Sequence, residues 1–336
     1  MGADAIISSA MLQVADQFDH FEIQSHLARG GMSDIYRAHD LVSGRDVVLK
    51  IPDANMIGDP AQYERFQREL EVMNTLDHPA ILKGLGSGQY NRTPYLVTEP
   101  VEGQSLRDLI SARAPLPVDE AVALIRKIAD GLAYCHDHDV VHRDLKPENI
   151  LITPGGQPII MDFGLALTKG AQRVTYANLS ATAGTPEYMA PEQVEGKRGD
   201  PRTDLYAIGA MLYELLAGQP PFHGDNPLAI MAQHVQGAVP RLDRERPDTP
   251  RPIAAVVARC LQRDPDARYP DLHALIADLD HLDQVDTSIL DQTAGEAAAL
   301  PWWKSPTMRA VGIGLALVAG LVILGLAAQM LRGPVP

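Results

Sequence analysis

Cysteine is scarce in this chain of 336 residues, and the two that occur, Cys135 and Cys260, lie far apart. Neither stands in a pattern typical of zinc ligands, and two cysteines are too few for a disulfide framework. A structural metal site and a disulfide scaffold are therefore excluded as the basis of the fold. We expect both residues to be buried thiols in a reducing compartment.

Positive charge is also in short supply. The sequence has 29 Lys and Arg against 43 Asp and Glu, which gives a formal net charge of −14. Because nucleic-acid binding depends on clustered cations that neutralise phosphates, this balance excludes nucleic acid as the main partner. The first 20 residues contain neither the basic start nor the apolar run of a secretory signal.

Phe and Trp are few, but Leu, Ile, Val, Ala and Met supply enough bulk for a core. The length exceeds the range of a single core, so we expect two lobes or two domains. Strand-like alternation fills about 21–51, and a helix is predicted where Asp59 can cap and Pro60 can take the first position. From about Leu106 to Leu282 the pattern is mostly helical. A small sheet-rich lobe is therefore predicted to precede a larger helical one.

A long uncharged run lies near the end of the sequence. "AVGIGLALVAGLVILGLAA", residues 310–328, is about 28 Å long as a helix, close to the ~30 Å hydrocarbon core of a bilayer. Trp302 and Trp303 lie just upstream, at the depth of the membrane interface. A single transmembrane helix is predicted at 310–331.

The flanking residues predict an orientation for this span. Lys304 and Arg309 precede it and Arg332 follows, which favours a cytoplasmic location, at the inner membrane, for everything before the span and an outer C-terminus. Residues 332–336 form a tail too short to fold into an external sensor. The remaining segments are an N-terminal extension at 1–20 and an acidic linker at 283–309.

Small residues recur at a spacing of four within the predicted span. Gly312, Ala316 and Gly320 form a ridge that would let two spans approach closely, and a homodimer is one expectation from it. Glycine and alanine are common in spans, so the ridge is also compatible with a monomer.

Polar side chains crowd into the apolar stretch "VVHRDLKPENILI", residues 140–152. Asp144 and Asn149, with Asp162 of the downstream "IIMDFGLA", offer oxygen atoms at short turns, and Mg²⁺ or a substrate hydroxyl accepts such ligands. Lys146 adds a positive charge for a moving phosphoryl group. Any one of these residues is typical of a turn that caps local backbone. All of them together at this spacing are improbable as turns alone.

Two features upstream point to phosphate binding. Gly30 and Gly31 in "LARGGMSDIYRA" would let backbone N–H groups approach a phosphate, although a glycine pair is also typical of an ordinary turn. Lys50 ends the apolar strand "DVVLKI", where an inward-pointing amine needs a partner. Glu69 on the next predicted helix is available as that partner; the alternative is a solvated lysine.

The motifs "HRDLKPEN", "DFG", "GTPEYMAPE", "DLYAIGAMLYELLAGQPPF" and "DPDARYP" follow one another in this order. Together they resemble the eukaryotic-type protein kinases, and "GGMSDIYRA" and "HPAIL" are most similar to the bacterial membrane-anchored Ser/Thr branch. The likeness covers 21–282 and implies a bilobal α+β kinase fold with lobes at 21–101 and 102–282. It also implies ATP and Mg²⁺ as cofactors, with Mn²⁺ as a substitute, and Ser/Thr protein substrates.

The resemblance implies a role for each residue of the polar stretch. Asp144 would orient the substrate hydroxyl and accept its proton, and Lys146 would neutralise the γ-phosphoryl group. Asn149 and Asp162 would hold Mg²⁺.

The resemblance likewise implies a nucleotide site in the small lobe and at its junction with the large one. Lys50 would grip the phosphates with Glu69 as its partner, Thr98 would lie behind the adenine, and Leu151 beneath it. The implied nucleotide-binding residues are Leu27, Ala28, Arg29, Gly30, Gly31, Met32, Ser33, Ile35, Val48, Lys50, Glu69, Thr98, Glu99, Val101 and Leu151.

Three departures from the family pattern keep other readings open. Ala28 and Ser33 stand where the first and third loop glycines usually are, and Val48 replaces a smaller residue. They keep open a membrane-bound pseudokinase that acts as a binding scaffold, although no ligand or proton acceptor is missing. A small-molecule phosphotransferase fits the phosphate site but leaves "GTPEYMAPE" without purpose.

The resemblance further implies regulation. Arg143 precedes the catalytic aspartate, and in the family this arginine contacts a phosphate on the activation loop. Thr175, Ser180 and Thr182 are the candidates for phosphorylation, and autophosphorylation is expected on at least one. Asp204 and the pair formed by Glu192 with Arg268 match scaffold positions of the family rather than catalytic ones.

Overall fold

The structure is a computed structural model that describes residues 12–29, 33–52, 60–163, 186–197 and 199–291. The chain divides into two units, Met1–Asp286 and Thr287–Pro336, and both lobes belong to the first. Within the described ranges, no helix has both the length and the apolar composition needed to cross a bilayer. The predicted span at 310–331 lies outside the described residues.

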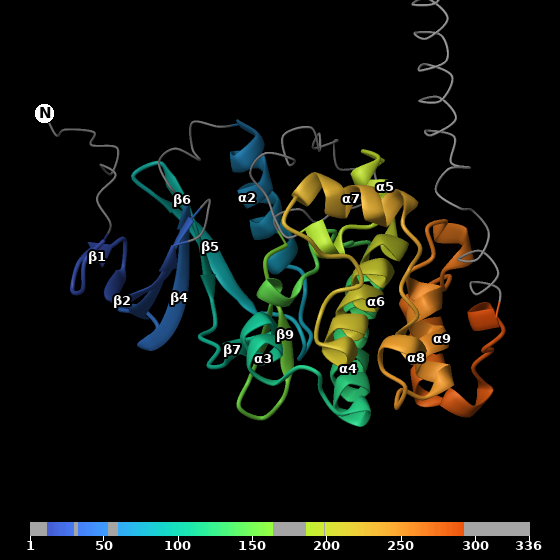
Figure 1. The fold of residues 1–336 in the computed structure, drawn as a ribbon. Helices are drawn as coiled ribbons and strands as arrows, with labels where there is room; N and C mark the ends of the chain where they lie inside the picture. Colours follow the sequence, from blue (N-terminus) through green and yellow to red (C-terminus); the bar gives the residue numbers. More distant parts are fainter. Residues whose placement is uncertain (1–11, 30–32, 53–59, 164–185, 198, 292–336) are drawn as a thin grey trace, which may run out of the picture. The chain divides into compact units, whose positions relative to one another are not determined.

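The first part of the unit is an antiparallel sheet. Figure 1 shows its strands from blue to cyan, beside helix α2. In the described chain the strand order is β1-β2-β3-β4-β6-β5. The strands are β1 (Gln17–Phe18), β2 (Phe21–Arg29), β3 (Ser33–Asp40), β4 (Arg45–Pro52), β5 (Gly84–Tyr90) and β6 (Thr93–Thr98).

The two faces of this sheet carry different sets of side chains, because successive side chains on a strand point to opposite sides. On one face lies a hydrophobic core cluster. Ile35 pairs with Lys50 and Val48 pairs with Thr98, so these four side chains share the opposite face of the sheet. The members of the core cluster are Phe18, Phe21, Ile23, Tyr36, Ala38, Val47, Leu49, Ile51, Tyr95 and Val97.

Helix α2 (Pro60–Met73) follows β4 and brings an acid toward the sheet. Phe66, Leu70 and Met73 of this helix are all buried. Gly84 of β5 approaches the end of the helix so closely that a Cβ atom there would lie 2.5 Å from the Met73 carbonyl oxygen. Only glycine allows this contact, which holds the helix against the edge of the sheet.

The second part of the unit is helical and is built around α6 (Pro201–Ala217), which contacts both α4 (Val118–Asp137) and α9 (Arg251–Cys260) (Figure 1). Helix α6 is buried along almost its whole length and ends at Gly218, whose φ is 81°. Cys135 and Cys260 are buried and free, as predicted. The remaining helices are α3 (Leu106–Arg113), α5 (Pro191–Val194), α7 (Pro227–Gln236), α8 (Leu242–Glu245) and α10 (Leu272–Asp280).

A small sheet and two short 3₁₀ turns carry the polar motifs. The sheet consists of β7 (Gln104–Ser105), β8 (Ile150–Ile152) and β9 (Pro158–Ile160), and the turns are η1 (Pro147–Asn149) and η3 (Pro186–Tyr188). Ile160 of β9 donates its N–H to Ala80 and accepts from the N–H of Leu82, both on the segment before β5. These bonds tie the end of β9 to the small lobe. The predicted bilobal arrangement, sheet first and helices second, is confirmed.

Candidate active site

The side chains of Lys50, Glu69 and Asp162 meet in the space between the two lobes. Lys50 Nζ, near the end of β4, donates to both carboxylate oxygens of Glu69 on α2, each at 2.7 Å. The same ammonium lies 3.4 Å from Oδ1 of Asp162, which follows β9. One cation from the small lobe is thus shared by carboxylates from both lobes, as the sequence predicted for Glu69.

Electrostatics keep this cluster ionised at Lys50 and Asp162. Burial on its own lowers the pKa of Lys50, but the charges of Asp162 and Glu69 outweigh it, and the net pKa is raised. The charge of Lys50 lowers the pKa of Asp162, against the effect of burial. Burial raises the pKa of Glu69, and the Lys50 ammonium opposes that rise. Lys50 therefore stays positive, ready to bind an anion.

The polar turn at the centre of "HRDLKPEN" folds back on itself. Lys146 Nζ donates to Oδ2 of Asp144 at 2.8 Å. The side-chain amide nitrogen of Asn149 donates to the backbone oxygen of Asp144 at 2.7 Å and to its Oδ2 at 3.2 Å. The carboxylate, ammonium and amide predicted to act together are therefore in direct contact, and Asp144 Oδ2 is their common point.

Backbone bonds connect this turn to the segment that carries Asp162. The N–H of Met161 donates to the Asn149 carbonyl at 3.0 Å, and the His142 ring nitrogen Nε2 lies 3.1 Å from the Met161 carbonyl. Together with the contact between Lys50 and Asp162, these bonds form one continuous chain of interactions. Lys50, Asp144, Asn149 and Asp162 are thereby brought together in one neighbourhood.

A buried carboxylate below the turn holds its backbone in place. Asp204 of α6 is 1% exposed and accepts from the N–H groups of His142 at 2.9 Å and Arg143 at 2.8 Å. His136 Nε2 lies 2.8 Å from the same carboxylate. Burial raises the pKa of Asp204, but the hydrogen bond from His136 and the other contacts bring it below its ordinary value. Asp204 is thus a charged anchor for two successive amides, the scaffold position that the sequence predicted.

Two residues of the site have a backbone conformation that L-amino acids rarely adopt. Arg143 has a φ of 67° and Asp162 a φ of 68°. Such conformations cost free energy and persist where the surroundings impose them, as the bond from Arg143 N–H to Asp204 does here. Arg143 directly precedes Asp144, so one strained position lies next to each of the two carboxylates, Asp144 and Asp162.

The chemistry of these donors fits a divalent cation with bound phosphates. The nitrogen of the Asn149 amide is used on Asp144, so its carbonyl oxygen is the atom that a metal would take. The Asp162 side chain is 46% exposed and its pKa is lowered. The described residues contain no cluster of three or more His, Cys, Asp or Glu with metal-binding geometry. Mg²⁺ commonly uses one or two protein oxygens and completes its shell with phosphates and water, so this pair suits it.

Apart from Lys50 and Glu69, the residues implied to bind the nucleotide differ in their exposure. Leu27, Ala28 and Arg29 are exposed at the end of β2, Ser33 is buried, and Thr98 is buried at the end of β6. The half-buried ones are Ile35, Val48, Glu99, Val101 and Leu151. Those outside the described residues are Gly30, Gly31 and Met32.

The segment after Thr98 joins the lobes. The N–H of Glu99 donates to the Lys83 carbonyl at 3.1 Å, so this amide is already used within the small lobe. The carbonyl of Glu99 and the backbone of Val101 are the groups that this segment would offer to the adenine of a nucleotide, since Pro100 has no N–H.

The implied phosphorylation sites Thr175, Ser180 and Thr182 lie outside the described residues. Arg143, the residue implied to contact a phosphate there, is buried, and its carbonyl accepts from Nε2 of Gln193 on α5 at 2.8 Å.

The scaffold pair implied by the resemblance is in contact. Arg268 Nη1 and Nη2 each lie 2.8 Å from a carboxylate oxygen of Glu192, a parallel two-bond arrangement in the interior. The guanidinium also lies over the ring of Tyr206.

Sequence reasoning missed one group of charged residues beside the polar turn of "HRDLKPEN". Arg107 of α3 contacts Glu148, Tyr188 and Glu214, which are 41, 81 and 107 positions away. No local spacing signals contacts at such separations. His136, which braces Asp204, was missed as well, because a histidine in a helix has many possible partners.

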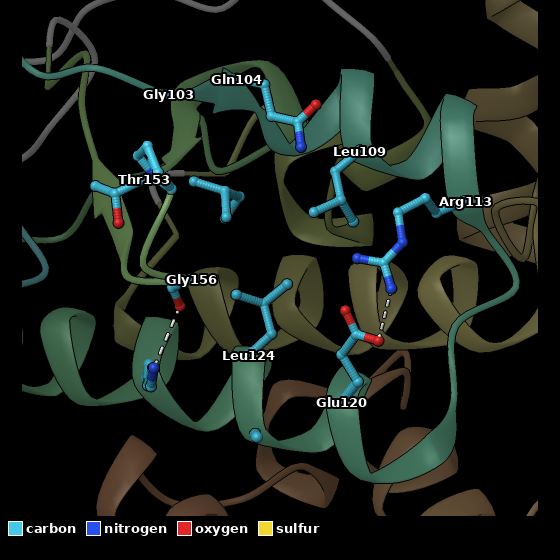
Figure 2. A pocket seen from close by; sticks show the side chains of 12 residues that line it. Gly103, Gln104, Leu109, Arg113, Glu120, Leu124, Thr153 and Gly156 are labelled. Carbon is cyan, nitrogen blue, oxygen red and sulfur yellow. Dashed lines mark hydrogen bonds and ion pairs between the residues drawn. The ribbon is translucent and has the colours of Figure 1, made fainter.

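A separate hollow lies on the large lobe, between α3, α4 and the turn after β8. It has a volume of about 530 Å³, and Figure 2 shows Leu109 and Leu124 on its walls. The charged groups at its rim are paired, Arg113 with Glu120 at 2.9 Å and Lys127 with the Gly156 carbonyl at 3.2 Å. None of the predicted site residues lines it.

Comparisons with known proteins agree with this geometry. The family profile described as "Protein kinase domain" matches residues 21–278. Serine/threonine-protein kinase PknB of Mycolicibacterium smegmatis is 38% identical over 266 residues, which cover 78% of this chain and 42% of that protein. Serine/threonine-protein kinase PknL of Mycobacterium bovis is 37% identical over 287 residues, covering 85% of this chain and 68% of that one.

Among solved structures, the kinase domain of Mycobacterium tuberculosis PknI has a TM-score of 0.63 at 26% identity and is matched over its full length by 81% of this chain. The chain spans less than half the length of PknB, the first of these relatives.

Proposed function

Because the chain belongs to the protein kinase family, we propose that it is a serine/threonine protein kinase, which transfers the γ-phosphoryl group of ATP to Ser and Thr hydroxyls of proteins. The kinase domain that we propose extends over residues 21–282. The observation that carries the proposal is the convergence of Lys50, Asp144, Asn149 and Asp162. Lys50 and Asp162 are 112 positions apart in sequence, yet their side chains are in contact.

In the proposed reaction Asp144 orients the incoming hydroxyl and accepts its proton as the new O–P bond forms. The bond between the γ-phosphorus and the bridging oxygen breaks, and ADP leaves. Lys146, which already lies against Asp144, neutralises charge on the moving phosphoryl group. Its contact with Asp144 Oδ2 supports a joint role for this base and this cation.

Lys50 would bind the phosphates of ATP that stay behind. Its contact with Glu69 fixes the ammonium in the cleft and relieves the cost of burying either charge alone. Asn149 and Asp162 would hold Mg²⁺, which supplies charge neutralisation between the phosphates when bound. Positioning and charge account for most of the rate in such a transfer, since little covalent chemistry is required of the protein.

The direct test is transfer of label from γ-labelled ATP to a generic protein substrate by the full-length chain in detergent, with Mg²⁺ and then Mn²⁺. We expect incorporation into Ser and Thr, and a rate lower by about 10³-fold or more from Asp144→Asn, the matched variant that removes only the proton acceptor. Intact nucleotide binding without incorporation under any condition would support the pseudokinase scaffold instead. Label found only in small molecules would support a small-molecule phosphotransferase.

We also propose autophosphorylation on Thr175, Ser180 or Thr182. The support is Arg143, which a phosphorylated side chain could meet in a charge-assisted hydrogen bond. Mass spectrometry of the active protein tests this proposal. An unmodified 164–185 segment in fully active protein would rule it out.

The uncharged run at 310–328 supports a further part of the proposal, that the kinase is anchored in the inner membrane with its kinase domain in the cytoplasm. Confinement to the membrane would raise the effective concentration of kinase domains for one another, and we propose homodimers through Gly312 and Gly320. Carbonate-resistant sedimentation tests the anchor. Crosslinking of the parent beside a variant with leucine at both glycines tests the dimer.

A further inference from the structure

Arg107, the second residue of α3, connects three elements that meet beside the turn of "HRDLKPEN", residues 142–149. Because this turn carries Asp144, Lys146 and Asn149, it is called the catalytic turn below. Its Nε donates to Oε1 of Glu148 in η1 at 2.8 Å, and its Nη1 donates to Oε1 of Glu214 in α6 at 2.7 Å. Its Nη2 donates to the hydroxyl of Tyr188 in η3, and that hydroxyl donates to the second oxygen of Glu214. Each nitrogen of the guanidinium therefore serves a different element.

Two partners of Arg107 lie in segments that carry residues of the proposed site. Glu148 lies in the three-residue turn η1, next to Asn149 and two residues after Lys146. A displacement of Glu148 is therefore transmitted directly to a proposed magnesium ligand and to the proposed phosphoryl-binding ammonium. Tyr188 belongs to "GTPEYMAPE", the segment that resembles the family's platform for protein substrates.

The network is tightly held on the side of α6. Glu214 and Tyr188 are both 3% exposed, whereas the Arg107 and Glu148 side chains are 28% and 37% exposed. Burial and the charge of Glu214 raise the pKa of Tyr188, so its hydroxyl remains a donor. The planar fork of arginine can meet three acceptors in fixed directions, which the single ammonium of a lysine cannot do.

We propose that Arg107 is a positioning residue, which keeps the catalytic turn and the protein-substrate segment in register by clamping Glu148 and Tyr188 onto α6. This inference rests on the proposed kinase function. Lys50 and Glu69, which would hold the nucleotide phosphates, lie outside this network. Loss of the clamp should therefore impair the use of protein substrate far more than the binding of nucleotide.

The test compares Arg107→Met with the parent in the full-length protein. We expect kcat/KM for a protein substrate to fall 10- to 100-fold, while the Kd for ATP changes by less than threefold. Arg107→Lys should recover less than a third of the parent value, since charge alone does not replace the fork. Equal losses in substrate use and ATP binding, or full recovery with lysine, would overturn the inference.

A double-mutant cycle separates positioning from general destabilisation. Tyr188→Phe removes only the hydroxyl, and because both side chains act in one clamp, its effect on kcat/KM should be at least threefold smaller in Arg107→Met than in the parent. Independent, multiplicative effects would contradict the clamp. Should Arg107→Met not fold, the same cycle is measured with Arg107→Lys.

Arg126→Met is the matched control. Arg126 makes a two-bond contact with Asp280, between α4 and α10, at 2.7 and 3.0 Å and at an exposed site. Its kcat/KM should stay within twofold of the parent, and a loss as large as that of Arg107→Met would remove the special role of Arg107. If the parent itself phosphorylates no protein, the proposed function fails; if it does and Arg107→Met matches it, only the present inference fails.

Discussion

Two groups of opposite charges in this molecule use the same chemistry for different ends. At the junction of the two lobes, Lys50 contacts both Glu69 and Asp162, and the Asp162 side chain is 46% exposed. In the helical lobe, Arg268 and Glu192 form a pair whose side chains are 0% and 7% exposed. Both groups place cation and carboxylate at hydrogen-bond distance. They differ in what is left over for a ligand.

The interior pair has used its capacity within the protein. Besides its two bonds to Glu192, Arg268 donates to the backbone carbonyls of Gln262, Arg202 and Arg263. In the group around Lys50, by contrast, Asp162 has a strained backbone and a partly exposed carboxylate, and Lys50 remains charged beside it. A saturated group of charges stabilises architecture, whereas a group with open capacity is suited to bind and react.

The largest expected effect comes from Asp144, which lies in the same neighbourhood as the group around Lys50. Asp144→Asn removes the proton acceptor but keeps the shape, and the new amide can still meet Lys146, so we expect phosphoryl transfer to fall by about 10³-fold or more. The melting temperature should change by less than about 2 °C, because the side chain is partly exposed and forms no part of the core. Kinetics and thermal melts on the same preparation measure both.

A residual rate within tenfold of the parent would show that Asp144 is not the acceptor. A large fall in melting temperature would show that Asp144 stabilises the fold, as Arg268 and Glu192 do. The contrast between the two groups of charges would then not hold.

The saturated group should show the reverse pattern. Arg268→Met leaves the Glu192 carboxylate buried without its cation, and breaking such a pair costs about 3–5 kcal/mol. We expect that loss in the free energy of unfolding, measured by urea titration with circular dichroism. The kcat of the remaining folded protein should stay close to that of the parent.

Arg126→Met is again the control, since its exposed pair should contribute only about 0.2–1 kcal/mol. A loss for Arg268→Met that is no larger than this would contradict the assigned role.

The sequence was informative where polar residues interrupt apolar segments at short range. Asp144, Asn149 and Asp162 were found in this way, and the alternation of the sheet predicted which lobe comes first. The partners of the charges were harder to find. Glu69 was suggested for Lys50 by its nearby helix, and the pairing of Glu192 with Arg268 came only from the family resemblance. The three contacts of Arg107 join segments that only the folded chain brings together.

The N-terminal edge of the sheet shows the same limit. Gln17 and Phe18 form a strand too short for any pattern, and the predicted extension at 1–20 contains it. It forms because Ala15 N–H donates to the Ile23 carbonyl and because the Phe18 ring packs against Tyr90 and Tyr95. These tertiary contacts override the weak local preference.

An intermediate effect is expected from a buried titratable side chain of the helical lobe. His234 of α7 is 1% exposed, its Nδ1 lies 2.7 Å from the Tyr206 hydroxyl, and burial lowers its pKa to about 4. The folded state thus disfavours the proton that the unfolded chain binds below about pH 6.5. The resulting stability is fully present above that pH and is lost as pH falls toward 4.

Between pH 7 and 4.5 the loss due to His234 should be about 2 kcal/mol, and His234→Gln should lack that share of the decline. Urea titrations at both pH values measure the difference. Parallel pH profiles for the two proteins would show that His234 does not titrate in this way.

The smallest expected effect concerns Val48, on the face of the sheet that carries Lys50. Val48 is half-buried on β4 and pairs with Thr98, on the face that carries Lys50. Val48→Ala removes two methyl groups from a partly exposed position, so it should cost little stability while widening the space for the base. We expect the KM for ATP to fall two- to threefold with kcat unchanged, as measured in steady-state kinetics. A rise in KM would mean that the valine packs against the nucleotide. Apolar contact, as well as charge, would then contribute to the affinity for ATP.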